Sequence, residues 1–294
     1  APLSSYTEGI VGQPRSFIPS QAETQSDKTI SALLYRGLFR YDNFGSLVPD
    51  LAESWTISDN ETVYTIKLKP NQYWSDGSII SSKDLIYTAY KHADLAGVTT
   101  DLVDDLTVRY TLPNKYSPFL SLLTIGVMKS DSVEKTSSLF PVTSGKFRVV
   151  RVDKSGPVIK QVILGSMDDS FKIRKLVFRY YENEDEIILA SKLGEIDGFT
   201  SSKILGDGIQ NFANHKFPIQ GVYYALFFNL RNEKLKNIDL RQKMEKVLPI
   251  EEMIYGRGIR VQGPISRNVY TDREVITNKF DLNFKDNLVD TNII

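Results

Sequence analysis

Residues 47–90 constrain the fold of this chain more strongly than any other stretch. Val63 to Leu68 is rich in β-branched and aromatic residues, and its alternate apolar side chains share one face, as in a half-buried strand. Turn-forming residues at 58–61 separate this run from a shorter apolar run at 54–57. The pattern predicts two strands joined by a turn, with Trp55 and Trp74 in the core.

A helix is predicted to follow these strands. Ser81 or Ser82 is suited to cap it, and apolar residues recur at helical spacing from Leu85 to Tyr90. The residues alone therefore indicate a hairpin docked on a helix, which by itself says nothing about function.

Composition excludes several classes of protein. The 294 residues carry 36 basic and 36 acidic side chains, so no field of one sign is available to bind nucleic acid or an anionic membrane. No apolar run approaches the roughly 20 residues of a membrane helix. Cysteine is absent, which excludes disulfides, thiolate metal sites and a cysteine nucleophile. Apolar residues make up 41% of the chain, as in a globular protein.

Signals for catalysis are weak. His92 and His215 are the only histidines, and no nucleophile elbow, zinc motif or phosphate loop is present. The acidic run from Glu182 to Glu186 is open to two interpretations, a carboxylate or metal site and the start of a helix capped by Asn183, and the second is simpler. We therefore expect no enzyme, no metal and no cofactor. A carboxylate-dependent hydrolase and a surface or structural protein are the alternatives.

Periodicity predicts the remaining elements. Residues 91–105 are polar, and no element is predicted there. Residues 176–199 are predicted to form a strand–helix–strand unit with a right-handed crossover connection. The other predicted elements are a strand at 6–11, a helix capped by Asp27, strands at 106–112, 147–152 and 158–164, a continuous apolar central strand at 222–230, and a helix at 239–248.

Four short motifs stand in a fixed order within the opening stretch. They are LAESW at 51–55, YTIKLK at 64–69, WSDG at 74–77 and SKDL at 82–85. Together they resemble the signature of the extracytoplasmic solute-binding proteins of ABC importers, in the peptide, dipeptide and nickel class. Asn71 departs from that signature, in which glycine is usual. Further matches, including LGEID at 193–197, extend the resemblance from Tyr6 to about Ile265.

This resemblance implies a fold class and a division of the chain. The fold is expected to be α/β and of the type II periplasmic-binding-protein kind, with a mixed-sheet first lobe, a peripheral α+β sub-domain and a truncated second lobe. The expected divisions are 1–45 for the start of the first lobe, 46–140 for the sub-domain, 141–229 for the rest of the first lobe, and 230–294 for the start of the second.

The resemblance also implies where a ligand binds. In the family the loop after the second proline, here residues 20–25, lies at the ligand cleft, and the chain passes between lobes near 223–229. Glu23 is the residue expected to meet a cationic group on the ligand. The full set of candidate ligand-binding residues is Ala22, Glu23, Thr24, Gln25, Ser144, Tyr223, Tyr224 and Asn229.

The function implied is capture of an oligopeptide or related small solute for import, without catalysis. The partners implied are the solute and the permease of an ABC transporter, with no nucleic acid and a monomeric protein. We expect an extracytoplasmic location, in the periplasm or at the cell surface, with lipid anchoring before processing. Full members of the family are longer, so we expect this chain to be a fragment.

Overall fold

The computed structural model describes residues 4–43, 45–130, 137–201, 213, 225–255 and 260. The chain divides into two compact units, residues 1–212 and residues 213–294, which are considered separately. In the described part of the chain, no helix is long and apolar enough to cross a membrane.

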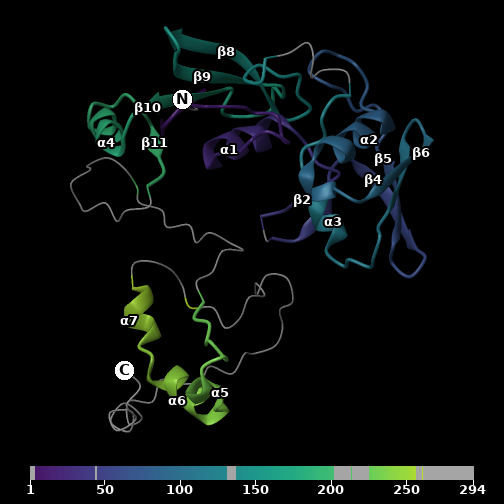
Figure 1. Cartoon of the computed structure of the whole chain (residues 1–294). Helices are drawn as coiled ribbons and strands as arrows, with labels where there is room; N and C mark the ends of the chain where they lie inside the picture. Colours follow the sequence, from purple (N-terminus) through teal and green to yellow (C-terminus); the bar gives the residue numbers. More distant parts are fainter. Residues whose placement is uncertain are drawn as a thin grey trace. The chain divides into compact units, whose positions relative to one another are not determined.

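A five-stranded mixed sheet forms the centre of the first unit (Figure 1). Its strand order is β11-β1-β10-β9-β8, with β1 parallel to β10 and β11 and the other pairs antiparallel. The bounds are β1 Ser5–Val11, β8 Phe147–Ser155, β9 Val158–Ser166, β10 Lys175–Tyr181 and β11 Gly198–Phe199. Strands from the two ends of the unit therefore pair directly, and most of the residues between β1 and β8 form an insertion.

Helices cover the two opposite faces of this sheet. Tyr180 packs into the main core together with Ile30 of helix α1 (Gln25–Leu34). The next residue, Tyr181, packs against a separate cluster that contains Ile187 of helix α4 (Glu184–Lys192). Because successive side chains of a strand point to opposite faces, α1 and α4 lie on opposite sides of β10. Residues 176–199 thus form the expected strand–helix–strand unit, with β1 inserted between its two strands.

The insertion carries its own sheet, in the order β4-β5-β7-β6 (Figure 1). The core face of this sheet is apolar because Tyr64, Ile66 and Val108 alternate with polar residues along β5 and β7. The elements of the insertion are β2 Phe39–Tyr41, β3 Leu47–Pro49, β4 Ala52–Ser58, β5 Val63–Leu68, α2 Ser82–Lys91, the 3₁₀ turn η1 Ala93–Leu95, β6 Thr99–Asp104, β7 Thr107–Thr111 and α3 Phe119–Leu122.

A buried carboxylate ties the motifs of the opening stretch together. Asp84 is almost fully buried, and its oxygens accept hydrogen bonds from Trp74 Nε1 at 3.2 Å, Ser81 N at 2.9 Å and Ser130 N at 2.9 Å. The Ser81 contact is half of a capping box at the start of α2, so Ser81 is the cap, one of the two predicted. The WSDG and SKDL motifs are therefore one hydrogen-bonded structure.

Three expectations about single elements were wrong. Trp55 is 38% exposed and meets Phe39 edge-on at 4.9 Å, because it lies on the edge strand β4. The N-cap of α1 is Thr24, and Asp27 stands three residues into the helix. The polar residues 91–105 contain the strand β6, which sequence periodicity missed because an edge strand exposes nearly all its side chains.

The described part of the second unit contains three short helices. They are α5 (Glu233–Lys236), α6 (Ile238–Val247) and α7 (Ile250–Ile254), so the predicted helix at 239–248 is confirmed. Residues 222–224 of the expected central strand lie outside the described residues, and residues 225–230 form no strand. Phe227 is 86% exposed there, since a central strand needs a neighbour on each side and the described residues supply none.

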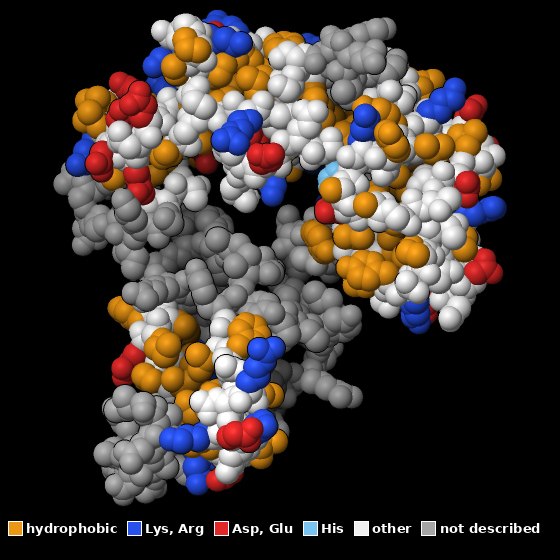
Figure 2. Space-filling model, viewed as in Figure 1, with side chains coloured by type: hydrophobic (Ala, Val, Ile, Leu, Met, Phe, Trp, Pro, Cys, Tyr) orange, Lys and Arg blue, Asp and Glu red, His pale blue; other side chains and the backbone are white. Residues whose placement is uncertain are grey.

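The predicted fold class and the predicted division of the chain have different outcomes. The mixed sheet with helices on both faces agrees with the predicted α/β class, whereas the division at 45, 140 and 229 stays a prediction. The face shown in Figure 2 has basic and acidic side chains interspersed over the first unit, in keeping with the balanced charge of the sequence.

Replacing Asp84 by Asn tests the buried carboxylate. Both Asp84 oxygens accept from N–H donors, so either orientation of the amide turns an N–H toward another N–H. We expect Asp84→Asn to lower the free energy of unfolding by about 2 to 3 kcal/mol, measured by urea denaturation. Asp101→Asn, on the exposed side of β6, is the control and should change it little; equal effects of the two substitutions would contradict this role.

Candidate functional site

The carboxyl ends of β1 and β10 meet at a topological switch point. Chain leaving β1 leads to α1 on one face of the sheet, and chain leaving β10 leads to α4 on the other. Gly12 N donates to Tyr181 O at 2.8 Å, so the two strand ends are joined directly. Ligands of open α/β sheets bind in the crevice outside the carboxyl ends of the strands at such points. This edge is the candidate site that the topology indicates.

The loop that follows β1 is held in place by hydrogen bonds within the loop and to the main chain of other segments. The Gln13 side chain donates to Ile159 O at 3.0 Å and accepts from Ile159 N at 2.7 Å, which ties the loop to β9. Phe17 N donates to Ser138 O at 2.9 Å, and Ser16 Oγ donates to Gln21 Oε1 at 3.0 Å. The loop is therefore largely fixed before any ligand binds, as is usual for binding sites.

The predicted ligand loop ends at the N-terminus of α1. Ala22 N closes a turn onto Ile18 O at 2.9 Å, and Thr24 Oγ1 caps the helix by accepting from Asp27 N at 3.1 Å. Gln25 is the first helical residue. Glu23 points into solvent and forms an ion pair with Arg15 at 3.3 Å. These four consecutive candidates therefore stand at the start of α1, and their contact with a ligand stays a prediction.

A half-buried carboxylate lies in the middle of β1, where this strand pairs with β11. Burial raises the pKa of Glu8, and hydrogen bonding with the hydroxyls of Tyr6 and Thr200 opposes that rise. Burial, followed by the nearby charge of Glu8, raises the pKa of Tyr6 to about 12. Gly198 leaves room for this cluster, because a Cβ there would lie 2.1 Å from the Tyr6 hydroxyl.

Ser144 lies apart from that loop, in the turn before β8. It is only 7% exposed, and its hydroxyl accepts from Arg36 N at 3.1 Å. Ser144 N and Gly145 N both donate to Leu34 O, at the end of α1. A Cβ on Gly145 would lie 2.4 Å from Leu33 O, so this close approach requires glycine.

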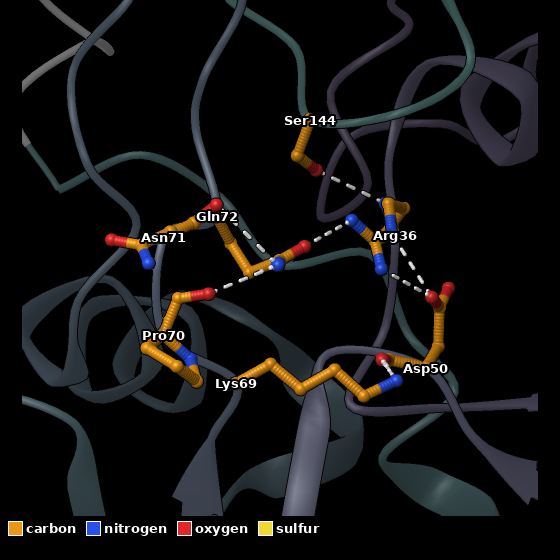
Figure 3. Close-up of polar contacts among 7 residues, drawn as sticks. All are labelled: Arg36, Asp50, Lys69, Pro70, Asn71, Gln72 and Ser144. Atoms are coloured by element: carbon orange, nitrogen blue, oxygen red, sulfur yellow. Dashed lines mark hydrogen bonds and ion pairs between the residues drawn. The ribbon is translucent and has the colours of Figure 1, made fainter.

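Arg36 connects this turn with the inserted sub-domain (Figure 3). Its guanidinium donates to Asp50 Oδ1 through Nε at 2.9 Å and Nη2 at 2.7 Å, and to Gln72 Oε1 through Nη1 at 2.8 Å. Lys69 Nζ donates to the Asp50 carbonyl oxygen at 2.6 Å. Ser144 is therefore engaged in a polar junction between the sheet and the insertion, and its ligand role stays a prediction.

The WSDG turn makes a second junction with the same segment. Ser75 N donates to Thr143 O at 2.7 Å, and Thr143 N donates to Ser75 Oγ at 3.0 Å. Asp76 in this turn pairs with Lys129 at 2.8 Å. Burial acts to raise the pKa of Asp76, but hydrogen bonds from Lys129 and Ser78 outweigh it and hold the pKa at about 2.

Three of the predicted ligand-binding residues belong to the second unit. Tyr223 and Tyr224 lie outside the described residues. Asn229 is exposed, and its Oδ1 accepts from Arg231 N at 3.1 Å in a turn before α5. Across the described ranges of both units, no group of three or more His, Cys, Asp or Glu side chains is placed to hold a metal ion.

Comparison with known proteins agrees with this architecture. A family model described as bacterial extracellular solute-binding proteins, family 5 Middle, matches residues 46–282. The chain belongs to this family. The resemblance found in the sequence motifs is therefore confirmed, and the proteins of the family are binding proteins by description.

Individual family 5 relatives match over part of their length. The glutathione-binding protein GsiB of Pectobacterium atrosepticum is 30% identical over 174 residues, which cover 51% of this chain and 33% of that protein. GsiB of Escherichia coli K12 is 25% identical over 239 residues, covering 76% and 43%. The chain thus spans less than half the length of these curated relatives.

Two solved structures show the same fold. NikZ from Campylobacter jejuni, in complex with Ni(L-His), has a TM-score of 0.68 at 24% identity, covering 98% of this chain and 63% of that one. The oligopeptide-binding protein AppA from Bacillus subtilis, in complex with a nonapeptide, has a TM-score of 0.65 at 19% identity, covering 97% and 63%. The expected type II periplasmic-binding-protein fold is confirmed.

Sequence reasoning missed the residues that fix the loop after β1 and the junction with the insertion. Gln13 acts through Ile159, which is 146 residues away in the chain. Arg36 and Asp27 act through Asp50 and the main chain of Arg15, which are 14 and 12 residues away. Of these, only Asp27 had a local signal, because an acidic residue three places after Thr24 is typical of a helix N-terminus.

Replacing Arg36 by Gln tests the junction shown in Figure 3. The substitution leaves the partly buried Asp50 without its cation, so we expect the free energy of unfolding to fall by about 1 to 3 kcal/mol. Arg40→Gln, on the exposed side of β2, is the matched control and should change it little. Equal urea midpoints for the two variants would argue against the junction.

The pH dependence of stability tests Asp76. Its pKa is about 2 in the folded protein and near 3.8 when unperturbed, so its contribution is complete above about pH 4 and is lost as the pH falls toward 2. The carboxylate is 36% exposed, so solvent screening limits this contribution to about 1 kcal/mol or less.

Asp76→Asn should remove that part of the acid dependence. The measurement is urea denaturation of both proteins between pH 2 and pH 5. Parallel pH profiles for the wild type and Asp76→Asn would contradict the assignment.

Proposed function

We propose that the chain is the solute-binding component of an ABC importer and captures oligopeptides or related small solutes. The observation that carries the proposal is membership of solute-binding family 5, matched over residues 46–282. The switch point at the ends of β1 and β10 supports it, because the segment that leads from β1 to the predicted ligand residues 20–25 begins there and is fixed by hydrogen bonds from β9 and α1.

The class of solute is proposed from the relatives and from the site. The relatives named above bind glutathione, a nonapeptide and a nickel–histidine complex according to their names and titles, and the first two are peptides. An extended peptide can be held through its main chain, which makes binding tolerant of its side chains. We place the contacts of the first unit at Ala22, Glu23, Thr24, Gln25 and Ser144. Tyr223, Tyr224 and Asn229 are proposed to contribute from the lobe junction.

The proposed partner is a membrane permease that receives the solute. Family 5 is described as extracellular, so we place the protein outside the cytoplasm, in the periplasm or held to the cell surface by a lipid anchor, and acting as a monomer. Catalysis has no part in this function: Glu186, the best placed carboxylate of the acidic run, accepts from Glu182 N and so completes the cap of α4.

Calorimetry and thermal shift with peptide pools test the proposal. The samples are the 294-residue chain and the complete product of its open reading frame, each with pools of two to nine residues and with Ni(L-His). We expect peptide binding, and a peptide at about 100 times its Kd should stabilise the protein by about 2.7 kcal/mol. Binding by neither sample would overturn the proposal. Peptide hydrolysis that is lost in Glu186→Gln would favour a carboxylate-dependent hydrolase instead.

A further inference from the structure

One ion pair joins Arg15, in the segment after β1, to Glu23, in the proposed ligand loop. Arg15 Nη1 meets Glu23 Oε2 at 3.3 Å, and the two side chains are 72% and 74% exposed. Within residues 12–24 Arg15 is the only basic residue and Glu23 the only acidic one. The loop therefore neutralises its own charge through a single solvent-exposed contact.

The main chain under this ion pair is held independently of it. Arg15 N donates to both oxygens of the buried Asp27, at 3.4 and 3.3 Å, and Arg15 O accepts from Ser138 Oγ at 3.3 Å. On the other side, Glu23 stands between the Ala22 turn and the Thr24 cap. The two charged side chains thus extend from a fixed framework, and neither is needed to build it.

We propose that Arg15 is an internal counterion of Glu23, displaced when a solute brings its own cationic group to that carboxylate. This inference rests on the proposed function and specifies its substrate class, namely peptides with an ammonium or guanidinium side chain. The pair is suited to exchange because it is monodentate and exposed, and such pairs contribute little to stability. A solute cation that becomes enclosed as it binds interacts with Glu23 more strongly, because less water screens the two charges.

Matched peptides separate this effect from general peptide binding. The probes are tetra-alanine peptides with lysine at each position in turn, compared with the same peptides carrying glutamine. Both series share the terminal amine, so the ratio of their Kd values reports the side-chain cation alone. Affinities are measured by calorimetry for the wild type and for Arg15→Gln, Glu23→Gln and the double variant.

Each variant has a distinct expected result. Arg15→Gln should lower the Kd of lysine peptides about two- to fivefold, the factor that an exposed ion pair is worth. It should leave the Kd of glutamine peptides unchanged. Glu23→Gln should raise the Kd of lysine peptides by a similar factor. In the Glu23→Gln background, Arg15→Gln should have no further effect, because Arg15 acts only through Glu23.

A distant variant controls for the loss of one positive charge. Arg151→Gln, in an exposed pair with Asp153 on β8, changes the net charge equally and should leave both peptide series unchanged. An equal gain in affinity for lysine peptides from Arg151→Gln would overturn the proposal that Arg15 is a counterion. So would a gain from Arg15→Gln that persists in the Glu23→Gln background. Equal binding of lysine and glutamine peptides by all variants would overturn it and leave the proposed function intact. Failure of every peptide to bind would overturn both.

Discussion

Parallel pairing of β1 with β10 is the constraint on which the first unit depends. The two strands lie near opposite ends of the unit in sequence, yet they pair residue by residue from Ser5 with Lys175 to Val11 with Tyr181. Everything between β1 and β8 must therefore leave the sheet and return to it. The same pairing places two strand ends side by side with their helices on opposite faces, the topology at which ligands of open α/β sheets bind.

Polar contacts determine how the insertion is attached to the sheet. Asp84 joins α2 to the WSDG turn and to Ser130, and Arg36 joins the end of α1 to Asp50, Gln72 and the Ser144 turn. The partners of Arg36 come from both the insertion and the turn before β8, whereas the partners of Asp84 all lie within the insertion. Buried groups of this kind are costly when unpaired, so they favour one arrangement of the two parts over others.

The segment from β1 to α1, which contains the proposed ligand residues, combines a fixed main chain with exposed side chains. Gln13, Asp27 and Ser138 hold the main chain, whereas Glu23 and Arg15 extend into solvent. A main chain fixed before binding lowers the entropy cost of capturing a ligand. Exposed side chains can change without disturbing that framework, which is one physical reason why a single fold can serve relatives named for glutathione, nickel–histidine and a nonapeptide.

Local patterns in the sequence determined the family, most of the strands and helices, and the caps at Ser81 and Asn183, because propensity, periodicity and capping act over a few residues. Sequence patterns did not predict the exposed Trp55, the edge strand β6, or the absence of a strand at 225–230, because each depends on which neighbours a strand acquires. The tertiary structure alone decided the Arg36 junction and the switch point. Both join residues that are far apart in the chain, and only the folded backbone brings such residues within hydrogen-bonding distance.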